Sequence, residues 1–216
     1  MNNLSNLTVI IVTYKTDYKI LEDCINSIPK NVKIKIIENS IKNDEDFFLQ
    51  EKIQNLSINY TGKNLGYGAG NNYGFDLTET DYAIVANPDI IFHKTFFENI
   101  EKYLDKDLDF TIIGSSYEND KTFSSSGLFK ENEKKEYKKE ITSKSGKIFN
   151  SLSKVDWVTG CMMLINLNKF NTKKIFDEFF FLYFEEFDLC KSIELKNENV
   201  FSAKDLLIDH LGYKGS

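Results

Sequence analysis

Two polar segments of this 216-residue chain carry side chains suited to binding a metal ion. Asn87-Pro88-Asp89 closes the apolar run Tyr82–Ala86, and α/β sheets bind ligands at the carboxyl ends of such strands. His210 follows the apolar residues 206–208. An oxygen-rich site with one imidazole suits Mn²⁺ or Mg²⁺. We therefore predict a divalent metal on Asp89 and His210, the alternatives being a Pro-Asp turn and a hydrogen-bonded core histidine.

A second cluster holds the carboxylates of Glu185, Glu186 and Asp188, directly after the aromatic run Phe179–Phe184. Aromatic neighbours desolvate a carboxylate and nearby negative charges disfavour its ionisation, and both effects make it a better proton acceptor for an alcohol. The cluster predicts a general base. Acidic residues at a helix N-terminus are the alternative interpretation, and the two are compatible.

A glycine-rich segment runs from Asn64 to Gly74. The third glycine of a dinucleotide-binding Gly-x-Gly-x-x-Gly motif would fall on Asn71, so this pattern does not favour a nicotinamide-binding fold. Two interpretations stay open: a loop whose backbone approaches a nucleotide-linked sugar, and glycine turns that allow close packing of a strand on a helix.

The amino-acid composition limits which ligands and partners are expected. All 27 basic residues are Lys, so no guanidinium is available to clamp a phosphate, and a divalent metal becomes the expected countercharge. The net charge of −6 gives no reason to expect nucleic acid. Three widely spaced cysteines and the lack of a signal peptide or a run of ~20 apolar residues predict a soluble cytoplasmic protein. Peripheral contact with the inner face of a membrane is compatible with this composition.

Alternating strand and helix patterns must position these groups. Strands are expected at 7–13, 33–38, 58–61, 82–86, 110–114, 155–165 and 206–209, and helices at 17–27, 71–77, 95–104 and 187–197. This order predicts a mainly parallel sheet flanked by helices within one domain, residues 1–216. The Lys-, Glu-, Ser- and Asn-rich range 117–154 predicts an exposed insertion.

The ordered motifs resemble the family 2 glycosyltransferases, and most closely their rhamnosyltransferase-like bacterial branch. The resemblance runs from about Leu7 to the C-terminus, apart from 117–154. Its motifs are Val12-Thr13-Tyr14, Ile36–Ser40, Asn64–Asn71, Ala86–Asp89, Trp157–Gly160 and Phe176–Cys190.

This resemblance implies a GT-A fold, which is a Rossmann-like sheet with a small antiparallel acceptor-side portion. It also implies inversion at the anomeric carbon and a divalent metal on the donor diphosphate. The implied metal residues are Asp89, at the last position of a motif that begins with Asn87, and His210. The implied base is Glu186, where the family usually has Asp. The positions that would line the nucleotide-sugar are Thr13, Tyr14 and Glu38, with Asn64, Gly66 and Asn71 nearby.

Two further residues are candidates on their own chemistry. Trp157 has an aromatic plane that suits a sugar face, and core packing is the equal alternative. Gly160 would let a ligand or a neighbouring backbone approach closely.

The resulting hypothesis is transfer of a sugar from a UDP- or dTDP-sugar to a hydroxyl of a glycan or lipid-linked glycan. Glu186 would deprotonate the hydroxyl, with Glu185 or Asp188 as sharing groups. The alternative is a catalytically impaired nucleotide-sugar-binding subunit of a glycan assembly complex, which Asn87, Glu186 and the chain end at Ser216 would favour. A sugar nucleotidyltransferase would need a glycine-rich N-terminal loop, and residues 12–15 contain no glycine.

Overall fold

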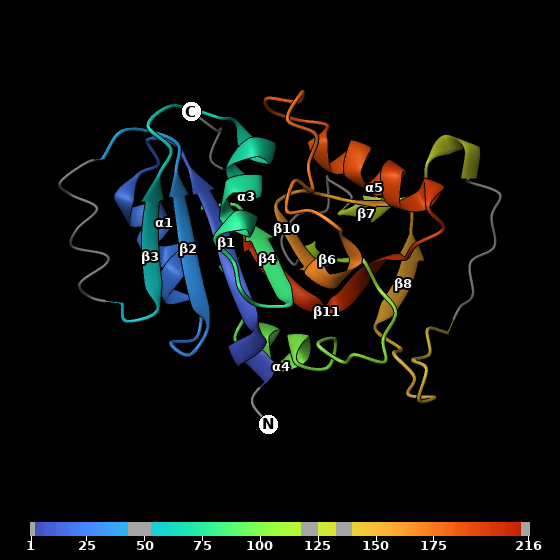
Figure 1. Cartoon of the computed structure of the whole chain (residues 1–216). Coiled ribbons are helices and arrows are strands. Elements are labelled where there is room, and N and C mark those ends of the chain that lie inside the picture. Colours follow the sequence, from blue (N-terminus) through green and yellow to red (C-terminus); the bar gives the residue numbers. More distant parts are fainter. Residues whose placement is uncertain (1–2, 43–52, 118–124, 133–139, 213–216) are drawn as a thin grey trace.

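The computed structural model describes residues 3–42, 53–117, 125–132 and 140–212. These residues form a nine-stranded sheet in the order β3-β2-β1-β4-β10-β6-β11-β5, with β8 paired to β11. A separate two-stranded sheet pairs β7 with β9. Helices flank the larger sheet (Figure 1).

Four neighbouring strands make a parallel half-sheet, as the alternating pattern predicts. In spatial order they are β3 (Leu56–Tyr60), β2 (Lys33–Glu38), β1 (Leu7–Thr13) and β4 (Tyr82–Ala86). β1 and β4 are apolar and almost wholly buried, as expected for strands covered on both faces. Their carboxyl ends therefore meet at one edge of the sheet.

The other half of the sheet mixes directions. β10 (Met162–Asn166) lies antiparallel between β4 and β6 (Ile112–Tyr117), while β11 (Val200–His210) runs parallel to β6. β5 (Ile90–Phe92) and β8 (Leu152–Val155) both pair with β11 in antiparallel fashion. The α/β fold with a mostly parallel sheet and an antiparallel portion is confirmed.

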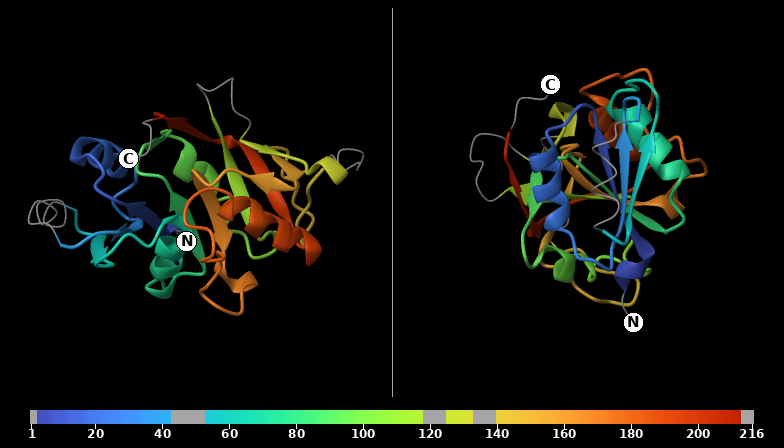
Figure 2. Two further views of the ribbon diagram at one scale, coloured as in Figure 1. Left: turned by 90° about the horizontal axis from the view of Figure 1, so that it is seen from above. Right: turned by 90° about the vertical axis from the view of Figure 1, so that its left-hand side faces the viewer.

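Helices cover both faces. α1 (Tyr18–Asn26) and α4 (Phe96–Ile100) pack in one apolar cluster, while α3 (Tyr67–Asp76) and α5 (Glu185–Leu195) pack in the other. Figure 2 shows α1 and α3 on opposite sides of the sheet in its right-hand view. The short 3-10 turns are η1 (Asn3–Asn6), η3 (Lys130–Asn132) and η4 (Leu167–Lys169).

The predicted single strand 155–165 is wrong, because the structure divides it. Residues 157–158 form β9, which pairs with β7 (Ser126–Gly127) in the separate sheet. Val155 still belongs to β8, and the chain returns to the main sheet as β10 only after Thr159 and Gly160. The break places Gly160 and Cys161 beside the end of β4, where the Asn87 N–H donates to the Cys161 carbonyl at 2.9 Å.

Two elements beside the predicted metal residues differ from expectation as well. The three-residue strand β5 is too short for a periodicity to reveal it, and β11 spans eleven residues, although only its apolar end was predicted. Together they form the ladder that carries Asp89 and His210.

The range 117–154 is only partly described. Its described residues include Phe149 and Leu152, which are 5% and 2% exposed and belong to the main core. These two side chains therefore anchor the described part of this range to the domain. In the described part of the chain, no helix has the length and apolar character needed to cross a membrane.

Candidate active site

Asp89 and His210 meet at the carboxyl edge of the sheet. β5 begins directly after Asp89 and pairs with β11 so that Ile90 lies opposite His210. The Leu211 N–H donates to the Asp89 carbonyl at 2.9 Å, and His210 Nε2 lies 3.4 Å from Asp89 Oδ1. Strand pairing, rather than a flexible loop, thus sets this distance.

The donors of this pair fit a hard divalent cation. One carboxylate and one imidazole suit Mn²⁺ or Mg²⁺, which also accept oxygen ligands from phosphates and water. Among the described residues, no three His, Cys, Asp or Glu side chains gather where one ion could touch them all. A metal here would therefore take no more than two ligands from the His, Cys, Asp and Glu side chains of the described residues, with substrate and solvent as further ligands.

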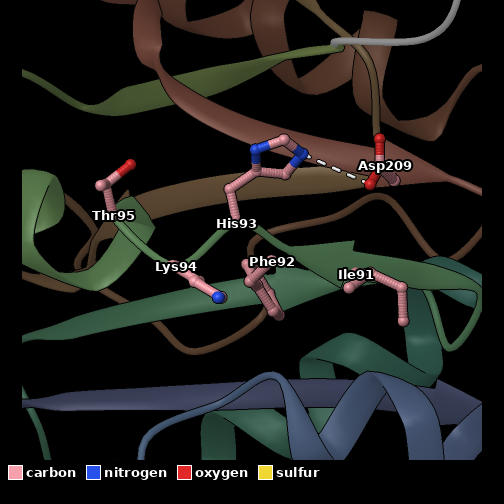
Figure 3. A pocket seen from close by; sticks show the side chains of 6 residues that line it. All are labelled: Ile91, Phe92, His93, Lys94, Thr95 and Asp209. Atoms are coloured by element: carbon pink, nitrogen blue, oxygen red, sulfur yellow. Dashed lines mark ion pairs between the residues drawn. The ribbon is translucent and has the colours of Figure 1, made fainter.

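Beside this pair lies a second imidazole and carboxylate pair. Asp209 precedes His210 on β11, and its Oδ2 lies 3.3 Å from His93 Nε2. Ile91, Phe92, Lys94 and Thr95 complete the lining of a pocket of about 420 Å³ around His93 and Asp209 (Figure 3). The pair connects the residue that follows β5 to β11, so it stabilises the ladder that brings Asp89 close to His210.

The three carboxylates of the predicted base cluster open helix α5 and face different surroundings. Glu185 is 4% exposed, and its Oε2 has no hydrogen-bond partner among the described residues. Glu186 is partly buried, with its Cβ on the side of Gly160, whereas Asp188 is exposed. The structure therefore separates one buried, one intermediate and one solvated carboxylate.

Burial perturbs the first two carboxylates. Desolvation raises the pKa of Glu185 to about 7, with a smaller contribution from the charge of Glu186. Desolvation also raises the pKa of Glu186, partly offset by backbone N–H groups, including that of Gly160. A carboxylate with a raised pKa that still reaches the sheet edge is a suitable proton acceptor, and Glu186 combines these properties best.

The glycine-rich segment begins α3 at a residue that only glycine fits. Gly66 caps the helix at φ +82°, and a Cβ there would overlap the carbonyl oxygen of Phe181. The Tyr67 N–H donates to that same carbonyl at 3.0 Å, and the Tyr67 hydroxyl donates to the Gly160 carbonyl. Of the two interpretations kept for this segment, close packing is therefore present, while the approach to a ligand remains a prediction.

Polar side chains at the ends of β1 and β2 form a hydrogen-bonded set. Thr13 Oγ1 donates to Glu38 Oε2 at 2.6 Å. The buried Asn39, a residue that the sequence did not single out, donates to the Gly66 carbonyl at 2.9 Å. Asn64 Oδ1 accepts from the Gly66 N–H at 3.0 Å. The set links two strand ends to the glycine turn.

Other predicted nucleotide residues lie near this set with different exposure. Tyr14 follows β1, is partly exposed, and carries the Lys15 ammonium 5.3 Å from its ring centroid. Asn71 is fully buried in α3 and donates to the Tyr67 carbonyl at 3.0 Å. In this structure the Asn71 side chain therefore contacts its own helix. The partly exposed Tyr14 ring is accessible to a ligand.

Asn72, which sequence reasoning missed, holds the segment that leads to the aromatic run. Its amide nitrogen donates to the Phe176 carbonyl at 2.9 Å, and its oxygen accepts from the N–H groups of Ile175 and Phe176 at 2.9 and 3.0 Å. The available signal was a polar residue on the buried face of a helix, since Asn72 is 2% exposed.

Trp157 is partly buried and packs against protein. The centroid of its ring lies 4.9 Å from that of Phe187, and the indole also packs against Gly127. Core packing, one of its two predicted roles, is thus observed, and contact with a sugar remains a prediction.

A sheet with a parallel four-strand half, an antiparallel extension and polar groups at the shared carboxyl edge defines the GT-A fold. Solved structures with this architecture include GalNAc-T7 with UDP, GalNAc and Mn²⁺ (TM-score 0.68, 10% identity, 94% of this chain and 42% of that chain). A second is the mannosyltransferase PcManGT of Pyrobaculum calidifontis with GDP-Man and Mn²⁺ (TM-score 0.66, 11% identity, covering 97% of this chain and 57% of that chain). At these identities the likeness establishes the fold.

The sequence comparisons define the family. The model of glycosyl transferase family 2 matches residues 8–180, and the chain belongs to this family. It is similar to the low-salt glycan biosynthesis hexosyltransferase Agl10 of Haloferax volcanii, with 26% identity over 218 residues that cover 91% of this chain. The chain spans 64% of the length of that relative.

Proposed function

We propose that this family 2 glycosyltransferase moves a sugar, with inversion, from a UDP- or dTDP-sugar to a hydroxyl of a glycan or lipid-linked glycan. The observation that carries the proposal is the Asp89–His210 pair, 3.4 Å apart at the carboxyl edge of a GT-A sheet, and Glu186 beside Gly160 supports the choice of base. The fold neighbours bound to UDP, GDP-Man and Mn²⁺ support a nucleotide-sugar donor and a divalent metal.

In this mechanism the strand ends bind the donor. Glu38, held by Thr13, and Tyr14 line the base and ribose, and Asn64 and Gly66 lie beside them. Asp89 and His210 would hold Mn²⁺ or Mg²⁺, which supplies positive charge for the departing diphosphate. With no Arg in the chain, only Lys side chains remain as cationic protein groups for that charge.

Glu186 acts on the acceptor. Its carboxylate takes the hydroxyl proton as the acceptor oxygen bonds to the anomeric carbon, and the bond from that carbon to the diphosphate oxygen breaks on the opposite face. A single displacement of this kind inverts the configuration. Its raised pKa brings the base closer to neutrality, where a proton acceptor is most effective.

The test replaces Asp89, the only carboxylate of the Asn87-Pro88-Asp89 motif. Asp89→Ala should lower turnover by about 10²-fold or more, because the leaving group loses its main stabilisation. Lys63→Ala, an exposed cation after β3, is the control and should cost less. Unchanged turnover of Asp89→Ala with Mn²⁺ present would contradict the assignment.

The donor class has its own experiment. Thermal shift against UDP-, dTDP- and GDP-sugars, with and without Mn²⁺, should give one responding nucleotide whose effect requires the metal. A response to GDP-sugars alone would refute the proposed donor class.

The second candidate function is a nucleotide-sugar-binding subunit that has lost turnover, which the Asn at position 87 and the longer base Glu186 favour. Donor hydrolysis with Mn²⁺ separates the two candidates. Tight donor binding without hydrolysis or transfer would favour the binding subunit.

A further inference from the structure

The segment Phe179–Phe184 exposes an unusual run of large apolar side chains. Phe179 is 87% exposed, Tyr183 and Phe184 are each 67% exposed, and Phe181 and Leu182 are 55% and 50% exposed. Single exposed apolar residues are normal on a monomer, but a contiguous run of this size marks a contact surface. In Figure 1 the segment projects in orange beyond the sheet, just before α5.

The backbone of this aromatic loop is held in place. The Phe181 carbonyl accepts from the Tyr67 N–H at 3.0 Å, and the Phe179 N–H donates to Asp177 Oδ1 at 2.9 Å. Tyr183 and Phe184 adopt φ of +70° and +73°, a left-handed conformation that costs such residues about 1–3 kcal/mol each and is retained where the surroundings impose it. The chain thus displays these side chains on a fixed support.

Other exposed apolar side chains lie at the carboxyl edge of the sheet. Ile41, 75% exposed, follows β2, and Leu211, 45% exposed, follows β11. The two strands are five places apart in the sheet, which separates them by about 24 Å. Apolar contacts spread this widely along one edge suit a planar apolar medium, whereas a protein partner concentrates its affinity in a compact centre.

Exposed cations accompany the apolar groups. Lys15, Lys42 and Lys63 follow the carboxyl ends of β1, β2 and β3 in turn, and all three are exposed. Apolar side chains with a basic rim match the interface of a bilayer that contains anionic lipid. Asp177 and Glu178 lie beside the aromatic loop, so apolar contact rather than charge should provide most of the binding.

We propose that the aromatic loop Phe179–Phe184 inserts into the surface of a lipid bilayer, with Ile41 and Leu211 as further contacts and Lys15, Lys42 and Lys63 facing the headgroups. The bilayer would then face the edge that carries Glu186. Resting on the proposed function, this orientation selects a lipid-linked acceptor over a free glycan.

Vesicle co-sedimentation tests this proposal. The probe is vesicles of phosphatidylcholine with one fifth phosphatidylglycerol. The loop variant is Phe179→Ser with Leu182→Ser, and the matched control is Ile148→Ser with Leu195→Ser, which makes the same change at exposed positions outside this edge. We expect the wild type and the control to bind alike and the loop variant to bind about tenfold more weakly.

Three outcomes would overturn the proposal. The wild type could stay in the supernatant, the loop variant could bind as tightly as the control, or light scattering could show that the loop variant converts a dimer to a monomer, which would make a second copy the occupant. Donor turnover in vesicle-free buffer tests the proposed function separately: if the wild type neither hydrolyses nor transfers the donor sugar, that function is refuted and the vesicle result stands.

Discussion

The polar groups at the two halves of the sheet differ in their hydrogen bonding and in their pKa values. At the parallel half, Thr13 hydrogen-bonds to Glu38, and Asn39 hydrogen-bonds to the turn at Gly66. At the mixed half, Glu185 and Glu186 open α5 with pKa values raised by burial. The hydrogen bonds orient the side chains of the parallel half, although Glu38 Oε1 has no partner among the described residues, whereas the desolvated carboxylates gain basicity at a cost in stability. In the proposed mechanism the parallel half holds the nucleotide, while the mixed half carries the metal pair and the base.

Besides the pairing of β4 with β10, contacts of one residue, here called the seam, join the two halves. Tyr67, at the start of α3, bonds through its N–H to Phe181 and through its hydroxyl to Gly160. Because these two partners precede α5 and β10, the seam fixes the distance between the donor turn and the proposed base. Four substitutions test this division, from the largest expected effect to the smallest.

Glu186→Gln should lower the turnover number by about 10²–10⁴-fold, since the amide cannot accept the hydroxyl proton. Donor affinity should change little, because none of the groups proposed to bind the nucleotide or the metal is altered. Asp188→Asn makes the same change on the exposed face of the same helix and should cost far less. Steady-state kinetics on both variants decide the base, and a greater loss with Asp188→Asn would move the role there.

Gly66→Ala should break the seam. The new Cβ would overlap the Phe181 carbonyl oxygen at a φ of +82°, so we expect a loss of about 3 kcal/mol in the free energy of unfolding. Gly62→Ala is the control, because Gly62 has a φ of +75° but open space around a Cβ, and should cost about 1 kcal/mol. Equal losses in urea unfolding would show that the contact with Phe181 does not matter.

The parallel half could be predicted from the sequence almost completely. Its strands are continuous apolar runs between helical patterns, and residues 82–86 were placed correctly because burial on both faces leaves no polar position in β4. Asp89 and His210 could be proposed from residue types at strand ends, and the family resemblance added the choice of Glu186 within its carboxylate cluster. That Asp89 lies within 3.4 Å of His210 could not be read from sequence, because it depends on β5, a three-residue strand.

The mixed half was harder to predict because its elements are short and its contacts are distant. In the sequence Trp157 and Met162 share one apolar run, yet they belong to two sheets because of the turn at Gly160. Asn72 looks like any polar helix residue, and its role depends on a segment more than 100 positions away. Nothing local in the sequence records such pairings.

Glu185 should make stability depend on pH. Its pKa is raised to about 7 in the folded state, so the folded chain keeps this proton longer than the unfolded chain as the pH rises. The stability contributed by this group is full below pH ~4.3 and is lost as the pH rises through 7. Relative to Glu185→Gln, the wild type should lose about 2–3 kcal/mol between pH 5 and pH 8 in urea unfolding.

The control for this pH dependence is Glu79→Gln, at an exposed position between α3 and β4, which should leave the pH slope of the wild type unchanged. If Glu185→Gln shows the same slope as the wild type, the buried carboxylate does not carry the pH dependence, and the contrast between the two halves loses its electrostatic basis.

Thr13→Val tests the opposite half with the smallest change. The valine is similar in shape but removes the hydroxyl that donates to Glu38 Oε2, and Glu38 Oε1 already has no partner among the described residues. We expect donor affinity to fall about fivefold, the equivalent of about 1 kcal/mol, with the turnover number little changed. Thr8→Val provides the control, since Thr8 is equally buried at the other end of β1, where its hydroxyl hydrogen-bonds to that of Thr80. Donor titration by calorimetry should separate the two variants, and an equal loss of affinity in both would mean that stability of β1, rather than the orientation of Glu38, governs donor binding.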